Sequence, residues 1–225
     1  MEPYRQAFVD LLFPQRCVAC SKRASDLLCG GCFEALPYVG TPVCYRCGMP
    51  TAFETFVCEE CKGVDLGFVS ARAPLRYEGV GKEIVHALKY RGYTRVVERL
   101  MVPLMIGVVQ GSFDTVACIP LHRSRKRRRG FNQAELIAKA VAERMKIPFS
   151  AKLEAVRQTR DQVELSAEAR RKNVEGAFRA QGPVRGKVLL VDDVFTTGAT
   201  LSAGAEVLVR AGAAEVRALS LCRTC

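Results

Sequence analysis

Two adjacent carboxylates and a hydroxyl-rich turn are the residues in this chain whose types and spacing most clearly predict chemistry. Asp192 and Asp193 follow the apolar run 188–191, and Thr-Thr-Gly-Ala-Thr occupies residues 196–200. The apolar run predicts a strand buried on both faces, and the apolar spacing after the turn predicts a helix. Unpaired N–H groups at a helix start bind anions, and Gly198 lets a phosphate approach the backbone. Carboxylates instead accept hydrogen bonds from groups such as ribose hydroxyls, so the pattern predicts a site for a phosphorylated sugar.

A second group of chemically active residues lies in the first 61 positions, where cysteines occur as four Cys-x2-Cys pairs. These cysteines are Cys17, Cys20, Cys29, Cys32, Cys44, Cys47, Cys58 and Cys61. Two such pairs complete a tetrahedral zinc site, and four thiolates leave no position open for catalysis. We therefore expect two structural zinc ions, with metal binding supplying the folding free energy of a small module.

The spacing leaves the pairing of the four knuckles open. The simplest arrangement joins the first two pairs around one ion and the last two around the other, but the sequence does not exclude a cross-braced arrangement. Residues 1–66 are expected to form this double zinc ribbon together with a short amphipathic N-terminal segment. Residues 67–225 are expected to form an α/β domain with a parallel sheet flanked by helices.

A strongly basic segment follows a second predicted buried strand. Six of the seven residues from Arg123 to Arg129 are basic, and the predicted helix 133–145 comes next. In a parallel sheet this loop and the turn at residues 196–200 emerge on the same side, so the cations suit a pyrophosphate. A nucleic-acid surface and a plain solvated charge run are the alternatives, and one segment could serve both metabolite and DNA.

The polar stretch 157–178 is long for a loop within a compact domain, which favours a lid rich in arginine. An exposed helix over part of it is the plainer interpretation. Elsewhere we expect strands at 69–77, 115–120 and 215–222 and helices at 81–90 and 95–110, the last with a kink at Pro103. His86 and Lys89 are expected on the first of these helices, Lys89 as a solvated side chain.

Composition limits the classes of function. The chain has 225 residues, 49% hydrophobic residues and a formal charge of +11, which favours anionic partners. No apolar run is long enough to span a bilayer, and the first residues lack the features of a signal peptide. We therefore expect a cytoplasmic protein without stable membrane insertion.

The order of these motifs resembles the ComF family, in which a double zinc ribbon precedes a type I phosphoribosyltransferase domain. Residues 188–200 are similar to that domain's signature for phosphoribosyl pyrophosphate (PRPP). The other matching residues are the four cysteine pairs, Leu88–Gly92, Pro120–His122, Arg129–Gln133, Arg170, Asn173 and Gly176–Phe178.

The resemblance implies a role for each matching group. Asp192 and Asp193 would hold the ribose hydroxyls and stabilise a cationic transition state, and residues 196–200 would hold the 5-phosphate. The pyrophosphate would be bound by Leu121, His122, Arg123, Ser124 and Arg125. The flexible lid would include Arg157, Arg160, Gln162, Arg170 and Asn173. Magnesium would accompany the diphosphate with few direct protein ligands.

Two functions follow from this resemblance. The first is a phosphoribosyltransferase that acts on an unidentified acceptor. The second is a binding module that senses PRPP or nucleic acid without turnover. The family's association with competence implies cytoplasmic handling of single-stranded DNA during natural transformation, with competence-machinery proteins as partners.

Overall fold

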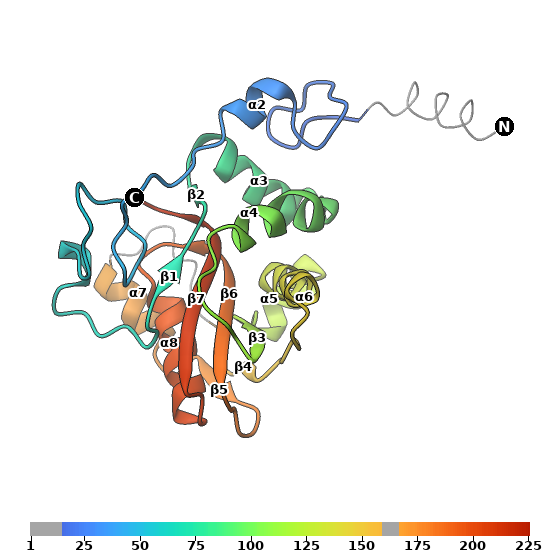
Figure 1. The fold of residues 1–225 in the computed structure, drawn as a ribbon. Helices are drawn as coiled ribbons and strands as arrows, with labels where there is room; N and C mark the ends of the chain where they lie inside the picture. Colours follow the sequence, from blue (N-terminus) through green and yellow to red (C-terminus); the bar gives the residue numbers. More distant parts are fainter. Residues whose placement is uncertain (1–14, 159–166) are drawn as a thin grey trace.

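A parallel β-sheet forms the centre of the protein (Figure 1). The structure is a computed structural model, and it describes residues 15–158 and 167–225. The strand order is β1–β7–β6–β3, and β2 also pairs with β7. The strands are β1 (Ala71–Arg72), β2 (Leu75–Arg76), β3 (Thr115–Cys118), β6 (Lys187–Phe195) and β7 (Glu215–Arg223). All five run parallel, so their carboxyl ends meet at one edge.

Strand β6 is buried on both faces, as its apolar run predicts. Val188 and Leu190 belong to one hydrophobic cluster, whereas Leu189 and Val191 belong to the other. Alternate side chains of a strand point to opposite faces, so this one strand contributes to the cores on both sides of the sheet.

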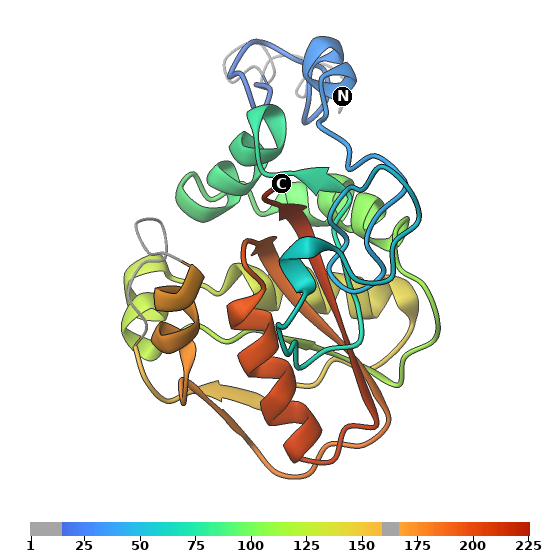
Figure 2. The ribbon, with the colours of Figure 1, turned by 90° about the vertical axis from the view of Figure 1, so that its left-hand side faces the viewer.

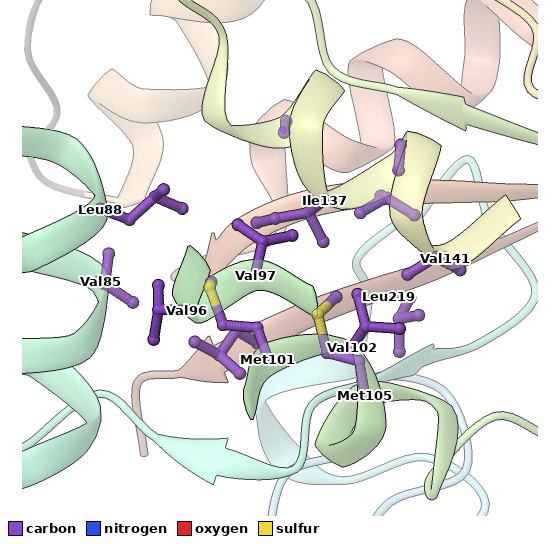
Figure 3. Packing of buried hydrophobic residues seen from close by; sticks show 14 of the residues in the cluster. Val85, Leu88, Val96, Val97, Met101, Val102, Met105, Ile137, Val141 and Leu219 are labelled. Atoms are coloured by element: carbon purple, nitrogen blue, oxygen red, sulfur yellow. The ribbon is translucent and has the colours of Figure 1, made fainter. Parts of the chain in front are cut away.

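Four helical elements cover the first face (Figure 3). They are α3 (Gly79–Tyr90), the π-helix η2 (Val97–Met101), α4 (Val102–Ile106) and α6 (Gln133–Met145). Asn132 caps α6 by accepting a hydrogen bond from the N–H of Ala134 at 3.1 Å, and the predicted bounds of this helix are confirmed. The predicted helix at 95–110 is present as a continuous helical stretch over residues 95–106, but its middle is the π-helix η2 and its end is α4. Pro103 has no N–H to donate to the preceding turn, which explains the change of hydrogen-bonding pattern.

Helix α8 (Ala199–Arg210) lies across the second face (Figure 2). The loops that carry Cys44, Cys47, Cys58 and Cys61 lie beside it, and these four cysteines share the hydrophobic cluster of this face. The 3-10 helix η1 (Glu59–Cys61) belongs to the same loops. The second group of cysteines therefore packs directly on the sheet domain.

Smaller elements complete the described chain. Helix α2 (Gly30–Glu34) contains Cys32 and has Cys29 as its N-cap residue, and Val18, Leu27 and Leu36 of this region join the cluster that includes α3. Strands β4 (Leu153–Ala155) and β5 (Phe178–Ala180) form an antiparallel pair, and α7 (Ala167–Val174) precedes β5. No helix within the described ranges has both the length and the apolar character to span a membrane. The predicted amphipathic N-terminal segment lies outside the described residues.

Three further predictions about secondary structure need correction. The basic segment, predicted as a loop, forms helix α5 (Arg123–Arg129), and the cations of its last turn suit the negative end of the helix dipole. The predicted strand 69–77 is interrupted at Pro74, which cannot donate to a ladder, and so appears as β1 and β2. Strand β6 does not end before the acidic pair, because its pairing with β7 continues through Phe195.

Candidate functional site

A cavity of about 790 Å³ lies at the carboxyl ends of the central strands. Its lining includes the acidic pair, Thr196 and Thr200 of the turn, and Leu121, His122 and Arg125 from the start of the basic segment. Residues predicted from separate parts of the sequence are thus brought to one site. Parallel pairing of β3 with β6 explains this, because it places the ends of both strands at the same edge.

The acidic pair lies within β6, and each carboxylate has a defined partner. Asp192 Oδ1 accepts a hydrogen bond from the N–H of Asp193 at 2.8 Å. Lys89 Nζ, at the end of α3, lies 2.8 Å from Asp193 Oδ2, and their side chains are only 20% and 13% exposed. The prediction that Lys89 is solvated is wrong. His86, in contrast, is exposed on the same helix and contacts the ring of Tyr90.

Burial and mutual repulsion determine the charges of this group. Burial, together with the charge of Asp193, raises the pKa of Asp192 to about 8. Burial alone would lower the pKa of Lys89, but the charge and hydrogen bond of Asp193 outweigh it, and the net effect raises that pKa. Near neutral pH one carboxyl is therefore largely protonated, and the other is neutralised by a lysine.

The turn at residues 196–200, called here the phosphate turn, leads directly into α8. Gly198 is the N-cap residue with φ +76°, and a Cβ at this position would lie 2.7 Å from the ring of Phe195. Only glycine fits both the backbone conformation and this space. Thr197 Oγ1 faces the N–H of Ala199 at 3.5 Å, whereas Thr196 and Thr200 line the cavity. The turn thus directs hydroxyls and a helix start toward the cavity.

Three of the five residues predicted to bind pyrophosphate line the cavity. Leu121, His122 and Arg125 line the cavity. Arg123 is exposed and pairs with Glu154 at 3.5 Å, so it does not belong to the lining. Ser124 Oγ contacts His122 Nδ1 at 2.8 Å, which holds the imidazole at the start of α5.

Two of the predicted lid residues have described side chains. Arg157 lines the cavity, and its Nη2 donates to the carbonyl of Asn173 at 3.0 Å and to that of Glu175 at 2.5 Å. Asn173 itself is not part of the lining. Arg160 and Gln162 lie outside the described residues, as does the side chain of Arg170. Arg157 therefore connects the described end of this segment, at Asn173 and Glu175, to the cavity lining.

Several lining residues were not predicted as site residues. Arg129 lies over the ring of Tyr90 at 5.5 Å and donates to Gln133 Oε1 at 2.8 Å. Thr224 lies beyond β7, and its Oγ1 donates to the carbonyl of Thr196 at 3.4 Å. Arg129 belongs to the family-matching segment Arg129–Gln133, so the sequence contained a signal for it. No local sequence pattern indicated Thr224.

The cysteines form two tetrads. The first comprises Cys17, Cys20, Cys29 and Cys32, and the second comprises Cys44, Cys47, Cys58 and Cys61. Within each tetrad the sulfur atoms lie within 4.8 Å of one another. This geometry supports the simple pairing over the cross-braced one.

The tetrads fit zinc in geometry and in chemistry. A tetrahedral site with Zn–S bonds of about 2.3 Å needs sulfurs about 3.8 Å apart. The Sγ atoms of Cys20 and Cys29 are 3.7 Å apart, and those of Cys47 and Cys58 are 3.5 Å apart. Although burial raises thiol pKa values, backbone N–H groups lower the pKa of Cys17 to about 6 and that of Cys44 to about 7. Burial and neighbouring thiols raise the pKa values of Cys32, Cys58 and Cys61. The two four-cysteine clusters are consistent with two structural zinc sites.

Comparison with known families identifies two segments of the chain. The "Double zinc ribbon domain" family matches residues 8–62, and the "Phosphoribosyl transferase domain" family matches residues 128–224. The sheet, its flanking helices and the tetrads are the structural counterparts of these matches, so the predicted fold class is confirmed.

Named relatives cover nearly the whole chain. The "DNA utilization protein YhgH" of Salmonella typhimurium is 31% identical over 206 residues, which is 88% of this chain and 90% of that protein. "Competence protein F" of Haemophilus influenzae is 27% identical and covers 94% of this chain and 98% of its own. "Competence protein ComFC" of Bacillus subtilis is 25% identical, with 90% and 86% covered.

Alignments with solved structures cover a smaller part of the chain. A glutamine PRPP amidotransferase from Bacillus subtilis, complexed with ADP and GMP, aligns at a TM-score of 0.39 and 23% identity. The alignment covers 54% of this chain and 25% of that enzyme.

Proposed function

Since this chain belongs to the ComF family, which joins a double zinc ribbon to a phosphoribosyltransferase domain, we propose that its cavity binds PRPP. The observation that carries the proposal is the convergence of the acidic pair, the phosphate turn and Arg125 on one cavity of about 790 Å³. These three groups match the hydroxyls, the monophosphate and the diphosphate of one ligand.

Each part of PRPP has a partner in this proposal. The 5-phosphate accepts hydrogen bonds from the phosphate turn, at the start of α8. The ribose hydroxyls donate to Asp192 and Asp193. The diphosphate meets the cavity-lining residues Leu121, His122, Arg125 and Arg157. Magnesium, which prefers oxygen ligands, would neutralise part of the diphosphate charge and could contact the acidic pair.

The proposed reaction is transfer of the phosphoribosyl group to an acceptor nucleophile. The bond between the anomeric carbon and the diphosphate oxygen breaks, and pyrophosphate leaves with the electron pair. The acceptor donates an electron pair to the anomeric carbon, and its proton passes to solvent or to a nearby base. An anionic acidic pair stabilises the positive charge that develops on the sugar.

Lys89 determines how strongly the acidic pair can act. While its ammonium lies 2.8 Å from Asp193, the pair offers little net negative charge to a cationic sugar. Turnover therefore requires Lys89 to move toward the diphosphate, whereas binding without turnover does not. This ion pair is the specific observation that favours the second candidate, a PRPP-sensing module.

Calorimetric titration with PRPP and magnesium tests binding, and pyrophosphate release with a panel of acceptors tests turnover. The Asp192→Asn/Asp193→Asn variant should lose PRPP affinity at least tenfold. Asp65→Asn, a carboxylate outside the cavity lining, is the matched control and should bind normally. No binding by the unaltered protein would refute the proposal, and binding without pyrophosphate release would favour the sensor.

We also propose that the protein acts in the cytoplasmic handling of single-stranded DNA in natural transformation, with competence-machinery proteins as partners. The names of its relatives, the charge of +11 and the basic helix α5 support this role. Lys126, Arg127 and Arg128 are exposed on α5 and could contact phosphates.

Fluorescence anisotropy of a labelled single-stranded oligonucleotide over a range of salt concentrations tests this role. The affinity should fall steeply with salt, and Arg127→Ala should lower the slope of log K against log salt by about one. Arg210→Ala, an exposed arginine on α8, is the control. Absence of salt-dependent binding at low ionic strength would exclude this role.

A further inference from the structure

Arg223, at the end of β7, is a buried cation between the second tetrad and the phosphate turn. Its side chain is only 2% exposed, although a guanidinium stays charged in proteins. Its Nη1 donates to the carbonyl of Cys47, and its Nη2 lies 3.5 Å from Met49 Sδ. Among the described residues no carboxylate forms an ion pair with it. A buried charge requires compensation, so the source of the opposite charge must be identified.

The second tetrad can supply that charge. Four thiolates around one Zn²⁺ ion leave a net negative charge, and all four cysteines of this tetrad are buried. Cys47 is both a tetrad member and the residue whose carbonyl accepts from Arg223. Zinc held by four thiolates and the buried guanidinium are therefore electrostatically complementary.

The same guanidinium contacts the element that shapes the phosphate turn. Its Cζ lies 5.2 Å from the centroid of the Phe195 ring, in a cation–π contact. The tip of that ring packs on Gly198, where a Cβ would lie 2.7 Å from Phe195 Cζ. Because the contact is so close, a shift of the ring requires a shift of the turn.

The residue after Arg223 forms a second connection. The N–H of Thr224 donates to the carbonyl of Phe195 at 2.9 Å, and its hydroxyl donates to the carbonyl of Thr196 at 3.4 Å. Thr224 also lines the cavity. Thr224 is thus hydrogen-bonded to the carbonyls of both Phe195 and Thr196. Arg223, which precedes it, holds this part of the backbone against the second tetrad.

We infer that Arg223 is a positioning residue that couples zinc at the second tetrad to PRPP at the phosphate turn. Each ligand stabilises the same arrangement of Arg223, Phe195 and the turn, so each strengthens binding of the other. The first tetrad, whose four cysteines are all described, forms no hydrogen bond with Arg223 and should not take part. This inference rests on the proposed PRPP site.

Zinc release to a chromogenic chelator, with and without saturating PRPP and magnesium, tests the coupling. Coupling by reciprocal linkage is typically about 5- to 150-fold. We expect PRPP to slow release of one of the two zinc equivalents about tenfold. A Cys20→Ser variant, which empties the first tetrad, should retain the protected equivalent and so assign it to the second tetrad.

Variants separate coupling from general stability. In Arg223→Met, which keeps much of the volume but not the charge, PRPP should protect zinc less than twofold. Arg223→Lys keeps the charge without the planar guanidinium and should give an intermediate value. Phe195→Leu should keep both zinc ions and lose the protection, which preserves the test if Arg223→Met does not fold. Arg217→Met is the matched control from the same strand, because its side chain pairs with Glu215 instead.

The outcomes are distinguishable because PRPP binding is measured by calorimetry on the same samples. PRPP bound by the unaltered protein with no change in zinc release overturns the coupling and leaves the proposed function intact. Full protection in both Arg223→Met and Phe195→Leu also overturns it. Absence of PRPP binding overturns the proposed function and this inference together.

Discussion

Replacement of Lys89 by methionine should destabilise the protein by leaving Asp193 without its cation. The ammonium lies 2.8 Å from the carboxylate, and the two side chains are 20% and 13% exposed. Removing one member of a fully buried pair typically costs about 3–5 kcal/mol. Because both groups retain some solvent contact, we expect a loss of about 2–3 kcal/mol at pH 8.

The expected change in the melting temperature follows from the size of the chain. For domains of 150–250 residues, 1 kcal/mol corresponds to roughly 2–4 °C, so Lys89→Met should melt about 4–12 °C lower at pH 8. At pH 5 the loss should be smaller, because the unpaired carboxyl can then take up a proton. Scanning calorimetry at both pH values measures the difference.

A double variant provides the control for this prediction. Lys89→Met/Asp193→Asn removes both charges and should recover to within about 1 kcal/mol of the unaltered protein, since neutral replacement of a buried pair is well tolerated. A loss below about 1 kcal/mol for Lys89→Met at pH 8, or no recovery in the double variant, would refute this account of the site.

Three other perturbations have defined outcomes. Burial and its acidic neighbour raise the pKa of Asp192 from 3.8 to about 8, so the unaltered protein loses stability as the pH rises through this window. Asp192→Asn lacks this loss, and its stability in urea relative to the unaltered protein should rise by more than about 1.4 kcal/mol between pH 5 and pH 9. Gly198→Ala, with φ +76° and the ring of Phe195 in its space, should weaken PRPP binding at least tenfold by calorimetry. Gly63→Ala has a similar φ of +66° but open space and should bind normally. Cys47→Ser should lower the zinc content from two ions to one in native mass spectrometry, and retention of both would contradict the tetrad.

The sequence was most informative where local pattern and tertiary context agree. The apolar run 188–191 is buried on both faces, and helix α6 has the predicted bounds 133–145. The four cysteine knuckles also form two closed sets. In each case one short stretch contains both the signal and the reason for the structure.

Other features depend on residues that are distant in the chain. Strand β6 continues through the acidic pair because β7 supplies backbone partners there, which overrides the low strand propensity of aspartate. Lys89 and Asp193 meet only when α3 packs beside the end of β6, so a single helix pattern could not predict their contact. The basic segment was predicted as a loop because repulsion between its like charges disfavours a helix. It forms α5 instead, in keeping with the high helix propensity of arginine and lysine.

The chain around the first tetrad and the second tetrad itself belong to different hydrophobic clusters, so loss of zinc from each should have a different effect. The chain around the first joins the core that includes α3, which carries Lys89, and Arg91 Nη2 of the same region donates to the carbonyl of Val18 at 2.6 Å. The second shares the core beneath α8, which the phosphate turn precedes. Zinc starvation or oxidation of the thiols would therefore reach the phosphate turn through the second tetrad and Arg223, whereas loss of zinc from the first tetrad would loosen the N-terminal module without altering that turn.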